Sequence, residues 1–223
     1  MRAIVFDFDG VIANSEPLHY RAYHGVLAAE GVSLTESDYY TRYLGYDDVG
    51  AFTAIAFDRG LAWTDAQVES LVARKAARME ELERDASVIF PGAREAIVSS
   101  AAAMPIAIAS GALGAEIRRI LAHAHLTSHF TAIVAAEDTP SSKPAPDPYL
   151  KAVELLRQAH GPIEASECVA LEDSRWGLDS ARAAGLRTVG VAHTYAEGEL
   201  TACADYVIPS MQAFDLADLQ RRF

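Results

Sequence analysis

Two aspartates follow the first apolar run of the chain. Asp7 and Asp9 stand in the string FDFDG, directly after residues 3–6. A carboxylate at the end of a buried strand is destabilising unless a cation or hydrogen bonds compensate its charge. In open α/β sheets, ligands bind at the carboxyl ends of the strands. The pair therefore indicates a ligand site, although a capped loop of solvated acids gives the same pattern.

Two later segments offer groups that suit a phosphate. Ser110 and Gly111 follow the apolar residues 106–109 and supply a small hydroxyl and a flexible backbone for a phosphoryl oxygen. Lys143 is one of only three lysines in the chain and could neutralise phosphate charge. An ordinary turn and an ordinary surface loop are the structural alternatives.

A second pair of acids follows another apolar run. Glu172 and Asp173 come directly after residues 168–171 and are followed by a serine. Adjacent carboxylates of this kind can hold a hard cation through oxygen ligands. The alternative is an N-cap for the next helix.

The elements that must position these side chains alternate along the chain. Short apolar runs separated by helical stretches predict an α/β fold with a parallel sheet. Several runs are almost continuously apolar, as expected for strands that are buried on both faces. The predicted strands are residues 3–6, 106–109, 132–135, 168–171, 187–191 and 206–208.

One long segment, residues 16–86, contains helical periodicity and no convincing strand. Thr64 and Gln67 have the spacing of a capping box, and an apolar stripe follows them. We predict a helical domain here, inserted into an α/β domain made of residues 1–15 and 87–223. The predicted stripe comprises Val68, Leu71, Val72, Ala76, Met79 and Leu82.

Three helices are predicted in the α/β domain from local signals. Asp147 and the proline after it are typical of a helix start, and the helix would carry Leu150, Val153 and Leu156. The alanine-rich residues 99–104 are interpreted as the end of a helix. A further helix is expected to start near residue 210.

Composition excludes several classes of protein. The 223 residues carry a formal net charge of -12, which disfavours sequence-independent binding to nucleic acid. No apolar run approaches the roughly 18 residues that span a bilayer. The first ten residues do not read as a signal peptide, and the two cysteines suit neither a disulfide framework nor a metal site. We therefore expect a cytoplasmic protein, a monomer unless an assembly is demonstrated, that contacts neither membrane nor nucleic acid.

The four groups, in this chain order, resemble the four motifs of the haloacid dehalogenase (HAD) superfamily. The string FDFDG that contains Asp7 and Asp9 is similar to the first motif and Ser110 to the second. Lys143 is similar to the third, and Glu172 with Asp173 to the fourth. The helical insertion resembles the C1 cap of that superfamily. The resemblance covers the whole chain and implies a Rossmann-like parallel core that carries an α-helical cap.

The resemblance also implies a mechanism. Asp7 would be the nucleophile that forms an aspartyl-phosphate, and Asp9 would donate a proton to the leaving oxygen and then help to deprotonate water. Mg²⁺ would be held by the carboxylates of Asp7 and Asp173 and the backbone carbonyl of Asp9, with Glu172 in support. The other phosphate-binding groups would be Lys143, Ser110 and backbone N–H groups, among them that of the Ser110-Gly111 loop.

Within the superfamily, the chain is most similar to the β-phosphoglucomutases and related phosphatases. Asp9 argues against dehalogenases, which lack this second aspartate. The cap lysine of phosphonate-cleaving members has no counterpart near the first motif. His19 matches a cap histidine that helps to position the acid at Asp9, and Gly45 resembles the start of the cap specificity loop.

The same cap loop separates phosphatases from mutases. Mutases carry an arginine there that grips a distal phosphate, whereas this chain has Asp47 and Asp48, which are expected to repel one. Arg42 is near enough in sequence to compensate. We expect a Mg²⁺-dependent phosphatase of a small phosphorylated metabolite, most plausibly a sugar phosphate. A sugar phosphomutase and a catalytically silent binding module remain as alternatives.

Overall fold

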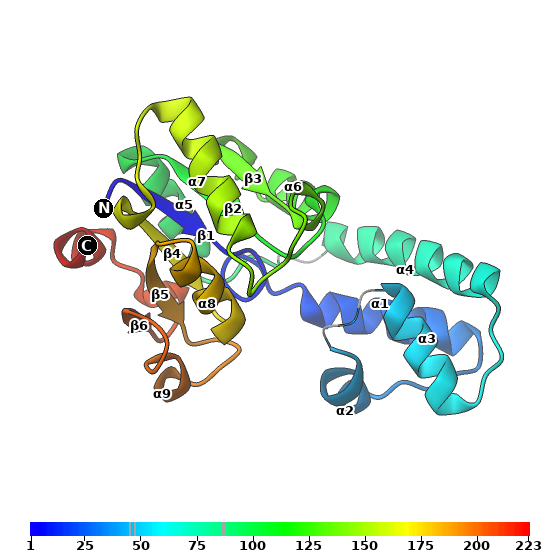
Figure 1. Ribbon diagram of the computed structural model, residues 1–223. Helices are drawn as coiled ribbons and strands as arrows, with labels where there is room; N and C mark the ends of the chain where they lie inside the picture. The colour runs from blue at the N-terminus through cyan, green and yellow to red at the C-terminus, as the bar shows by residue number, and fades with distance from the viewer. Residues whose placement is uncertain (45, 47, 86–87) are drawn as a thin grey trace. The chain divides into compact units, whose positions relative to one another are not determined.

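The computed structural model describes residues 1–44, 46, 48–85 and 88–223 (Figure 1). The chain divides into two compact units, one of Met1–Asn14 with Val88–Phe223 and one of Ser15–Ser87. Among the helices in the described residues, none combines the length and the apolar character needed to span a bilayer. The two units are an α/β unit and a helical unit.

A six-stranded sheet forms the centre of the α/β unit in the described residues. Its strand order is β3-β2-β1-β4-β5-β6 and every pairing is parallel. The predicted parallel α/β fold is confirmed. The strands are β1 (Ala3–Phe6), β2 (Ile106–Ala109), β3 (Ala132–Val134), β4 (Cys168–Glu172), β5 (Arg187–Val191) and β6 (Tyr206–Ile208).

Two strand ends differ from the prediction. β4 extends to Glu172 because this residue is paired with Gly190 of β5. β3 ends at Val134, and the backbone N–H of Ala135 instead donates to Asp138 Oδ2 over 2.9 Å. That hydrogen bond caps a 3₁₀ turn at Ala136–Asp138, which ends the strand one residue earlier than expected.

Helices cover both faces of the sheet (Figure 1). Ile4 and Phe6 of β1 belong to one apolar cluster, and Ala3 and Val5 belong to the other, as the two-residue period of a strand requires. The helices α5, α6 and α10 contribute to the first cluster, and α7 and α8 contribute to the second. Their bounds are α5 (Ala93–Ala103), α6 (Gly114–His123), α7 (Asp147–His160), α8 (Arg175–Ala183), α9 (Glu197–Leu200) and α10 (Leu216–Arg222).

The buried face of α7 includes Val153 and Leu156 as predicted and differs from the prediction at one position. Leu150 is 49% exposed, whereas Tyr149 is fully buried. Tyr149 lies on one helix face with Ala152, Val153 and Leu156, at the three- and four-residue spacing that defines such a face. Near the C-terminus, a 3₁₀ turn occupies Met211–Ala213, and α10 begins at Leu216 rather than near residue 210.

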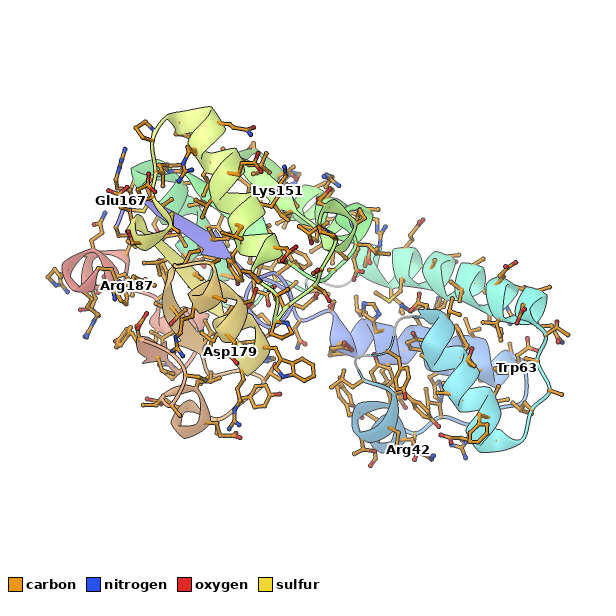
Figure 2. The ribbon with its side chains drawn as sticks, in the orientation of Figure 1. Arg42, Trp63, Lys151, Glu167, Asp179 and Arg187 are labelled. Carbon is orange, nitrogen blue, oxygen red and sulfur yellow. The ribbon has the colours of Figure 1, made fainter. Side chains whose placement is uncertain are left out.

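The helical unit has its own apolar core. Trp63, which is labelled in Figure 2, packs edge to face on Phe52, with ring centroids 6.5 Å apart. Tyr23 packs on Phe52 in the same way, with ring centroids 5.1 Å apart. Arg42, labelled in the same figure, lies in a short π-helical segment, Tyr39–Tyr43. The α-helices are α1 (Glu16–Ala29), α2 (Glu36–Asp38), α3 (Asp48–Arg59) and α4 (Asp65–Asp85).

The predicted capping box starts α4. The backbone N–H of Thr64 donates to Gln67 Oε1 over 2.9 Å, and that of Gln67 donates to Thr64 Oγ1 over 3.3 Å. The predicted apolar stripe is wrong at one position, because Ala76 is exposed and Lys75 is 3% exposed in its place. The buried residues of this stripe are Val68, Leu71, Lys75, Met79 and Leu82.

The α/β unit is closed where the chain leaves and re-enters it. The backbone N–H of Asn14 donates to Val88 O over 2.7 Å, and that of Phe90 donates to Ile12 O over 3.0 Å. Ala13 and Ile89 form the antiparallel bridge between these two bonds. This ladder anchors the loop that follows Asp7 at the edge of the sheet.

Candidate active site

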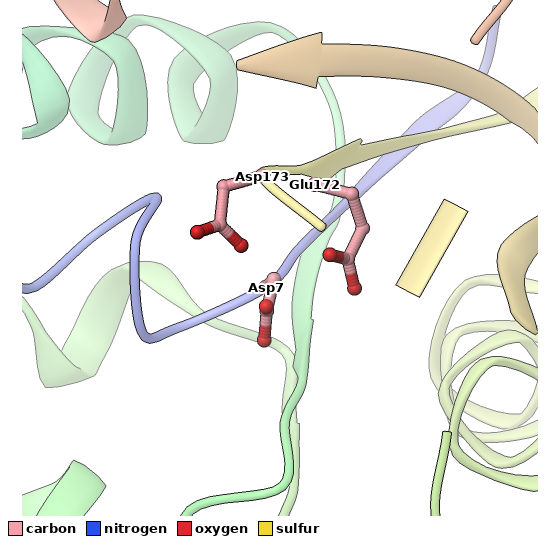
Figure 3. Close-up of side chains that lie close together, drawn as sticks. All are labelled: Asp7, Glu172 and Asp173. Atoms are coloured by element: carbon pink, nitrogen blue, oxygen red, sulfur yellow. The ribbon is translucent and has the colours of Figure 1, made fainter. Parts of the chain in front are cut away.

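The first and fourth motifs meet because β1 and β4 are neighbouring parallel strands. Phe6 is paired with Leu171, and the backbone N–H of Asp7 donates to Leu171 O over 2.9 Å. The next residues on both strands are therefore side by side. Figure 3 shows Asp7, Glu172 and Asp173 gathered at these strand ends. Each offers one carboxylate oxygen, and these oxygens lie within 4.8 Å of one another.

Lys143 neutralises part of this negative charge. Its Nζ lies 2.8 Å from Asp7 Oδ1 and 2.6 Å from Glu172 Oε1. The side chain of Lys143 is 12% exposed, and that of Glu172 is fully buried. The backbone N–H of Phe8 also donates to Asp7 Oδ1, over 2.7 Å. Two contacts on one oxygen fix the orientation of the Asp7 carboxylate.

Glu172 is held at both of its oxygens. The hydroxyl of Tyr149 donates to Oε1 over 2.7 Å, alongside Lys143. The hydroxyl of Ser174 donates to Oε2 over 3.2 Å, and the same oxygen atom of Ser174 caps α8 by accepting from Gly177 N. Sequence reasoning missed Tyr149, whose signal was its place beside Ala152 and Leu156 on the buried face of α7.

Asp173 is oriented by the loop after β5. The hydroxyl of Thr194 donates a hydrogen bond to Asp173 Oδ2, a contact for which the sequence carried no local signal. The carboxylate also fills the space beside Gly10, where a Cβ would lie 1.9 Å from Asp173 Oδ2. The φ of Gly10 is +79°, a left-handed conformation that favours glycine. The glycine of the first motif therefore makes room for the acid of the fourth.

The acids of this cluster repel one another. Burial, and then the charge of Glu172, raise the pKa of Asp7, which Lys143 opposes. The pKa of Asp173 is raised by the same two causes. The carboxylates of Asp7 and Glu172 keep the pKa of Lys143 above its usual value in spite of burial. One ammonium faces three acids, so the site has the charge and the oxygen donors to bind a hard cation such as Mg²⁺.

The remaining predicted groups of the α/β unit lie around this edge of the sheet. Ser110 follows β2, which is the other neighbour of β1, and is 2% exposed. Its Oγ accepts a hydrogen bond from Ala112 N over 3.0 Å. Gly111 is exposed and has no atom within 4 Å of the place that a Cβ would take. Asp9 is half-buried in the loop after β1 and bridges to Ala13 through its backbone.

The predicted cap residues belong to the helical unit. His19 lies in α1, where Lys75 Nζ is 2.8 Å from its Nδ1. Asp48 does not act as a free negative charge, because its Oδ1 lies 2.8 Å from Lys75 Nζ. Arg42 is paired with Asp58 over 2.6 Å. The predictions for Gly45 and Asp47 fall outside the described residues.

Comparisons with known proteins assign the chain to a family. The family description "Hydrolase: haloacid dehalogenase-like hydrolase" matches residues 1–185. Protein CbbY of Rhodobacter capsulatus is 31% identical over 96% of this chain and 95% of its own length. Hexitol phosphatase B of Escherichia coli K12 is 29% identical over 97% and 96%. The crystal structure of CbbY from Rhodobacter sphaeroides in complex with phosphate has a TM-score of 0.82 and 25% identity, with 99% of both chains covered. The chain therefore belongs to the family of haloacid dehalogenase-like hydrolases.

Proposed function

We propose that this protein is a Mg²⁺-dependent phosphatase that hydrolyses small phosphorylated sugars through an aspartyl-phosphate. The observation that carries the proposal is the cluster of Asp7, Lys143, Glu172 and Asp173 at the ends of β1 and β4. The similarity to a hexitol phosphatase over almost the whole chain supports a sugar phosphate as the substrate class.

The chemistry divides into two displacements at phosphorus. In the first, a carboxylate oxygen of Asp7 attacks the phosphorus, the ester P–O bond breaks, and Asp9 gives its proton to the departing alkoxide. In the second, Asp9 takes a proton from water, the water oxygen attacks the phosphorus, and the bond to Asp7 breaks to release phosphate. Each proton that Asp9 gives in the first step is recovered in the second.

The other residues hold charge in place. Asp7 and Asp173, with the backbone carbonyl of Asp9, would hold Mg²⁺, which supplies charge stabilisation to the transferring phosphoryl group. Lys143, whose Nζ lies 2.8 Å from Asp7 Oδ1, compensates the charge of Asp7 and would help to stabilise the phosphoryl oxygens. The oxygens of Glu172 already accept hydrogen bonds from three side chains. Glu172 would therefore hold Lys143 in place beside the metal site. Ser110 and the backbone at Gly111 would bind phosphoryl oxygens.

The proposal is tested by phosphate release from hexitol phosphates, hexose phosphates and non-sugar phosphate esters, after removal of metal and again with added Mg²⁺. We expect release only with Mg²⁺ and from a narrow set of sugar phosphates. Asp7→Asn should remove turnover while circular dichroism stays unchanged. Borohydride trapping should convert the acyl phosphate at residue 7 to homoserine, detected by peptide mass spectrometry. Activity that survives Asp7→Asn contradicts the assignment of the nucleophile.

The two alternatives predict different results in the same assays. A phosphomutase converts β-glucose 1-phosphate when a sugar bisphosphate is supplied as primer, and it releases little phosphate. A silent binding module binds a phosphorylated ligand, shown by calorimetry, and turns over nothing in either assay. Either pattern would replace the phosphatase proposal.

A further inference from the structure

The helical unit buries a charged lysine that the proposed reaction does not use. Lys75 occupies the inward face of α4 between Leu71 and Met79, and its side chain is 4% exposed. A buried ammonium is destabilising unless an opposite charge and hydrogen bonds compensate it. Asp48 of α3 supplies that charge, with Oδ1 2.8 Å from Lys75 Nζ. Lys75 is therefore held as a cation inside the unit.

Two side chains of α1 also contact this ion pair. Lys75 Nζ lies 2.8 Å from Nδ1 of His19 and 4.9 Å from the ring centroid of Tyr23. The hydroxyl of Tyr23 donates to Asp48 Oδ1 over 2.6 Å. The ammonium, the carboxylate, the phenol and the imidazole thus form one network across three helices, with bonds that fix where the polar hydrogens lie.

The chemistry of the ammonium decides the state of the imidazole. A protonated lysine has three N–H donors and no lone pair, so at the contact with His19 it must donate and Nδ1 must accept. In a neutral imidazole only one nitrogen carries hydrogen. We propose that Asp48 and Lys75 lock His19 in the Nε2–H tautomer. His19 then accepts a hydrogen bond at Nδ1 and carries its hydrogen at Nε2.

Asp48 then has a different role from the one expected from its position in the cap loop, which was to repel a distal phosphate. Its charge is compensated by Lys75, so it positions the lysine and, through it, the histidine. Toward the proposed phosphatase, on which this last step rests, His19 is then an Nε2–H donor and not a base. The tautomer itself does not depend on any activity.

The tautomer is measured directly by long-range ¹H–¹⁵N correlation on protein labelled with ¹⁵N-histidine at neutral pH. The chain contains seven histidines, and the signals of His19 are those that disappear in His19→Gln. We expect a bare Nδ1 and a protonated Nε2, with one set of signals. A protonated Nδ1, a mixture of tautomers or an imidazolium in the wild-type protein would overturn the proposal.

Variants then test the cause. Lys75→Met removes the donor and should release His19 into a mixture of forms, whereas Lys151→Met, an exposed lysine of α7 paired with Glu154, should change nothing (Figure 2). Asp48→Asn preserves the shape of the side chain but removes its charge, and it should also populate the Nδ1–H tautomer of His19. Asp38→Asn, which loses only an exposed pair with Arg59, is its control. If Lys75→Met does not fold, Asp48→Asn decides. An unchanged His19 spectrum in the folded variant contradicts the lock.

A kinetic comparison of two variants tells whether His19 acts as a hydrogen-bond donor or as a base. Gln at position 19 offers N–H donors, whereas Glu, of almost the same shape, offers only acceptors at neutral pH. We expect His19→Gln to retain kcat/KM within about tenfold, the scale of one neutral hydrogen bond, and His19→Glu to lose more. Higher activity in the Glu variant would show that His19 acts as a base. Because the spectra need no substrate, the lock can fail while the phosphatase proposal stands, and the reverse.

Discussion

Lys143 is the residue on which the charge balance of the α/β unit depends. It contacts two buried carboxylates at hydrogen-bonding distance, and the oxygens of those acids also lie near Asp173. A buried ion pair adds little stability compared with an apolar pair, but removal of one partner leaves the other charge uncompensated. The lysine therefore compensates the buried charge of both acids in the absence of metal.

Lys143→Met should destabilise the metal-free protein by about 3–5 kcal/mol, because it leaves Asp7 and Glu172 without their cation. It should also remove phosphatase activity. Urea denaturation in EDTA measures the loss, with Lys151→Met as the matched exposed control, which should stay within about 0.5 kcal/mol of the wild type. Equal midpoints for the two variants would show that Lys143 does not compensate these acids.

Gly10→Ala tests the close approach of the first and fourth motifs. The new Cβ would meet the Asp173 carboxylate at 1.9 Å and would force a left-handed φ on alanine. We expect at least about 1 kcal/mol of destabilisation from the backbone alone, and a larger loss of Mg²⁺ affinity because Asp173 must move. Calorimetric titration with Mg²⁺ measures the second effect.

Gly198→Ala is the control for that variant, because no atom lies within 4 Å of the place its Cβ would take. It should leave the Mg²⁺ affinity unchanged. If Gly10→Ala bound Mg²⁺ as tightly as this control, Asp173 would not need the space beside Gly10.

At the scale of the elements, β4 is buried on both faces, and this burial suppresses the reactivity of a cysteine side chain within it. Cys168 opens the strand with no exposed surface, and its pKa is raised to about 11 by burial and then by the charge of Glu167. The thiolate is the reactive form of cysteine, so a thiol with this pKa stays protonated near neutral pH. Its role in β4 is that of a small apolar residue.

Cys168 should accordingly resist thiol reagents in the folded protein. With 5,5′-dithiobis(2-nitrobenzoic acid) at pH 8, we expect at most one thiol to react in the native state, which peptide mapping should place at the half-buried Cys203. Both thiols should react after unfolding in guanidinium chloride. Rapid native labelling at Cys168 would mean that β4 opens far more readily than a central strand should.

The two errors in the predicted helix faces, in α4 and in α7, have the same cause. In α4 the predicted stripe passed through Ala76 and in α7 through Leu150, whereas the buried residues are Lys75 and Tyr149. Both buried residues fit the three- and four-residue spacing better than the aliphatic residues that follow them. They were overlooked because a polar group is expected at the surface. Each is buried because its polar atom has a partner, Asp48 for Lys75 and Glu172 for Tyr149.

At the scale of the whole molecule, the acidic cluster links metal binding to the stability of one unit. The chain has a formal net charge of -12, and the cluster concentrates three carboxylates around one lysine. A ligand that binds only the folded state stabilises it by mass action. Bound Mg²⁺ should therefore act on the α/β unit, which holds all of these residues, and not on the helical unit.

Addition of Mg²⁺ at about 100 times its Kd should stabilise the α/β unit by about 2.7 kcal/mol and raise its Tm by roughly 5–10 °C. Scanning calorimetry after EDTA treatment measures the shift, with NaCl at matched ionic strength as the control for screening. Asp7→Asn should reduce the shift strongly. An equal shift with NaCl would show that general screening, not a bound cation, is responsible.

The sequence by itself determined the parallel α/β fold, the positions of the strands and the order of the residues that could do chemistry. These follow from local patterns: apolar runs of strand length, capping residues, and acids placed where strands end. The resemblance of four short motifs to one superfamily, in the right order, indicated the family, and the family comparison confirmed it.

Only the tertiary structure decided which side chains share a site and in what state. The hydrogen bonds of Thr194 to Asp173, and of Lys75 to Asp48 and His19, join residues that are 21, 27 and 56 positions apart. No pattern along the chain reports such pairs, because their energy arises only when packing brings the two polar groups together away from water. Once they are together, desolvation makes the partner obligatory, and this is how the fold fixes the positions of Lys75 and Asp173.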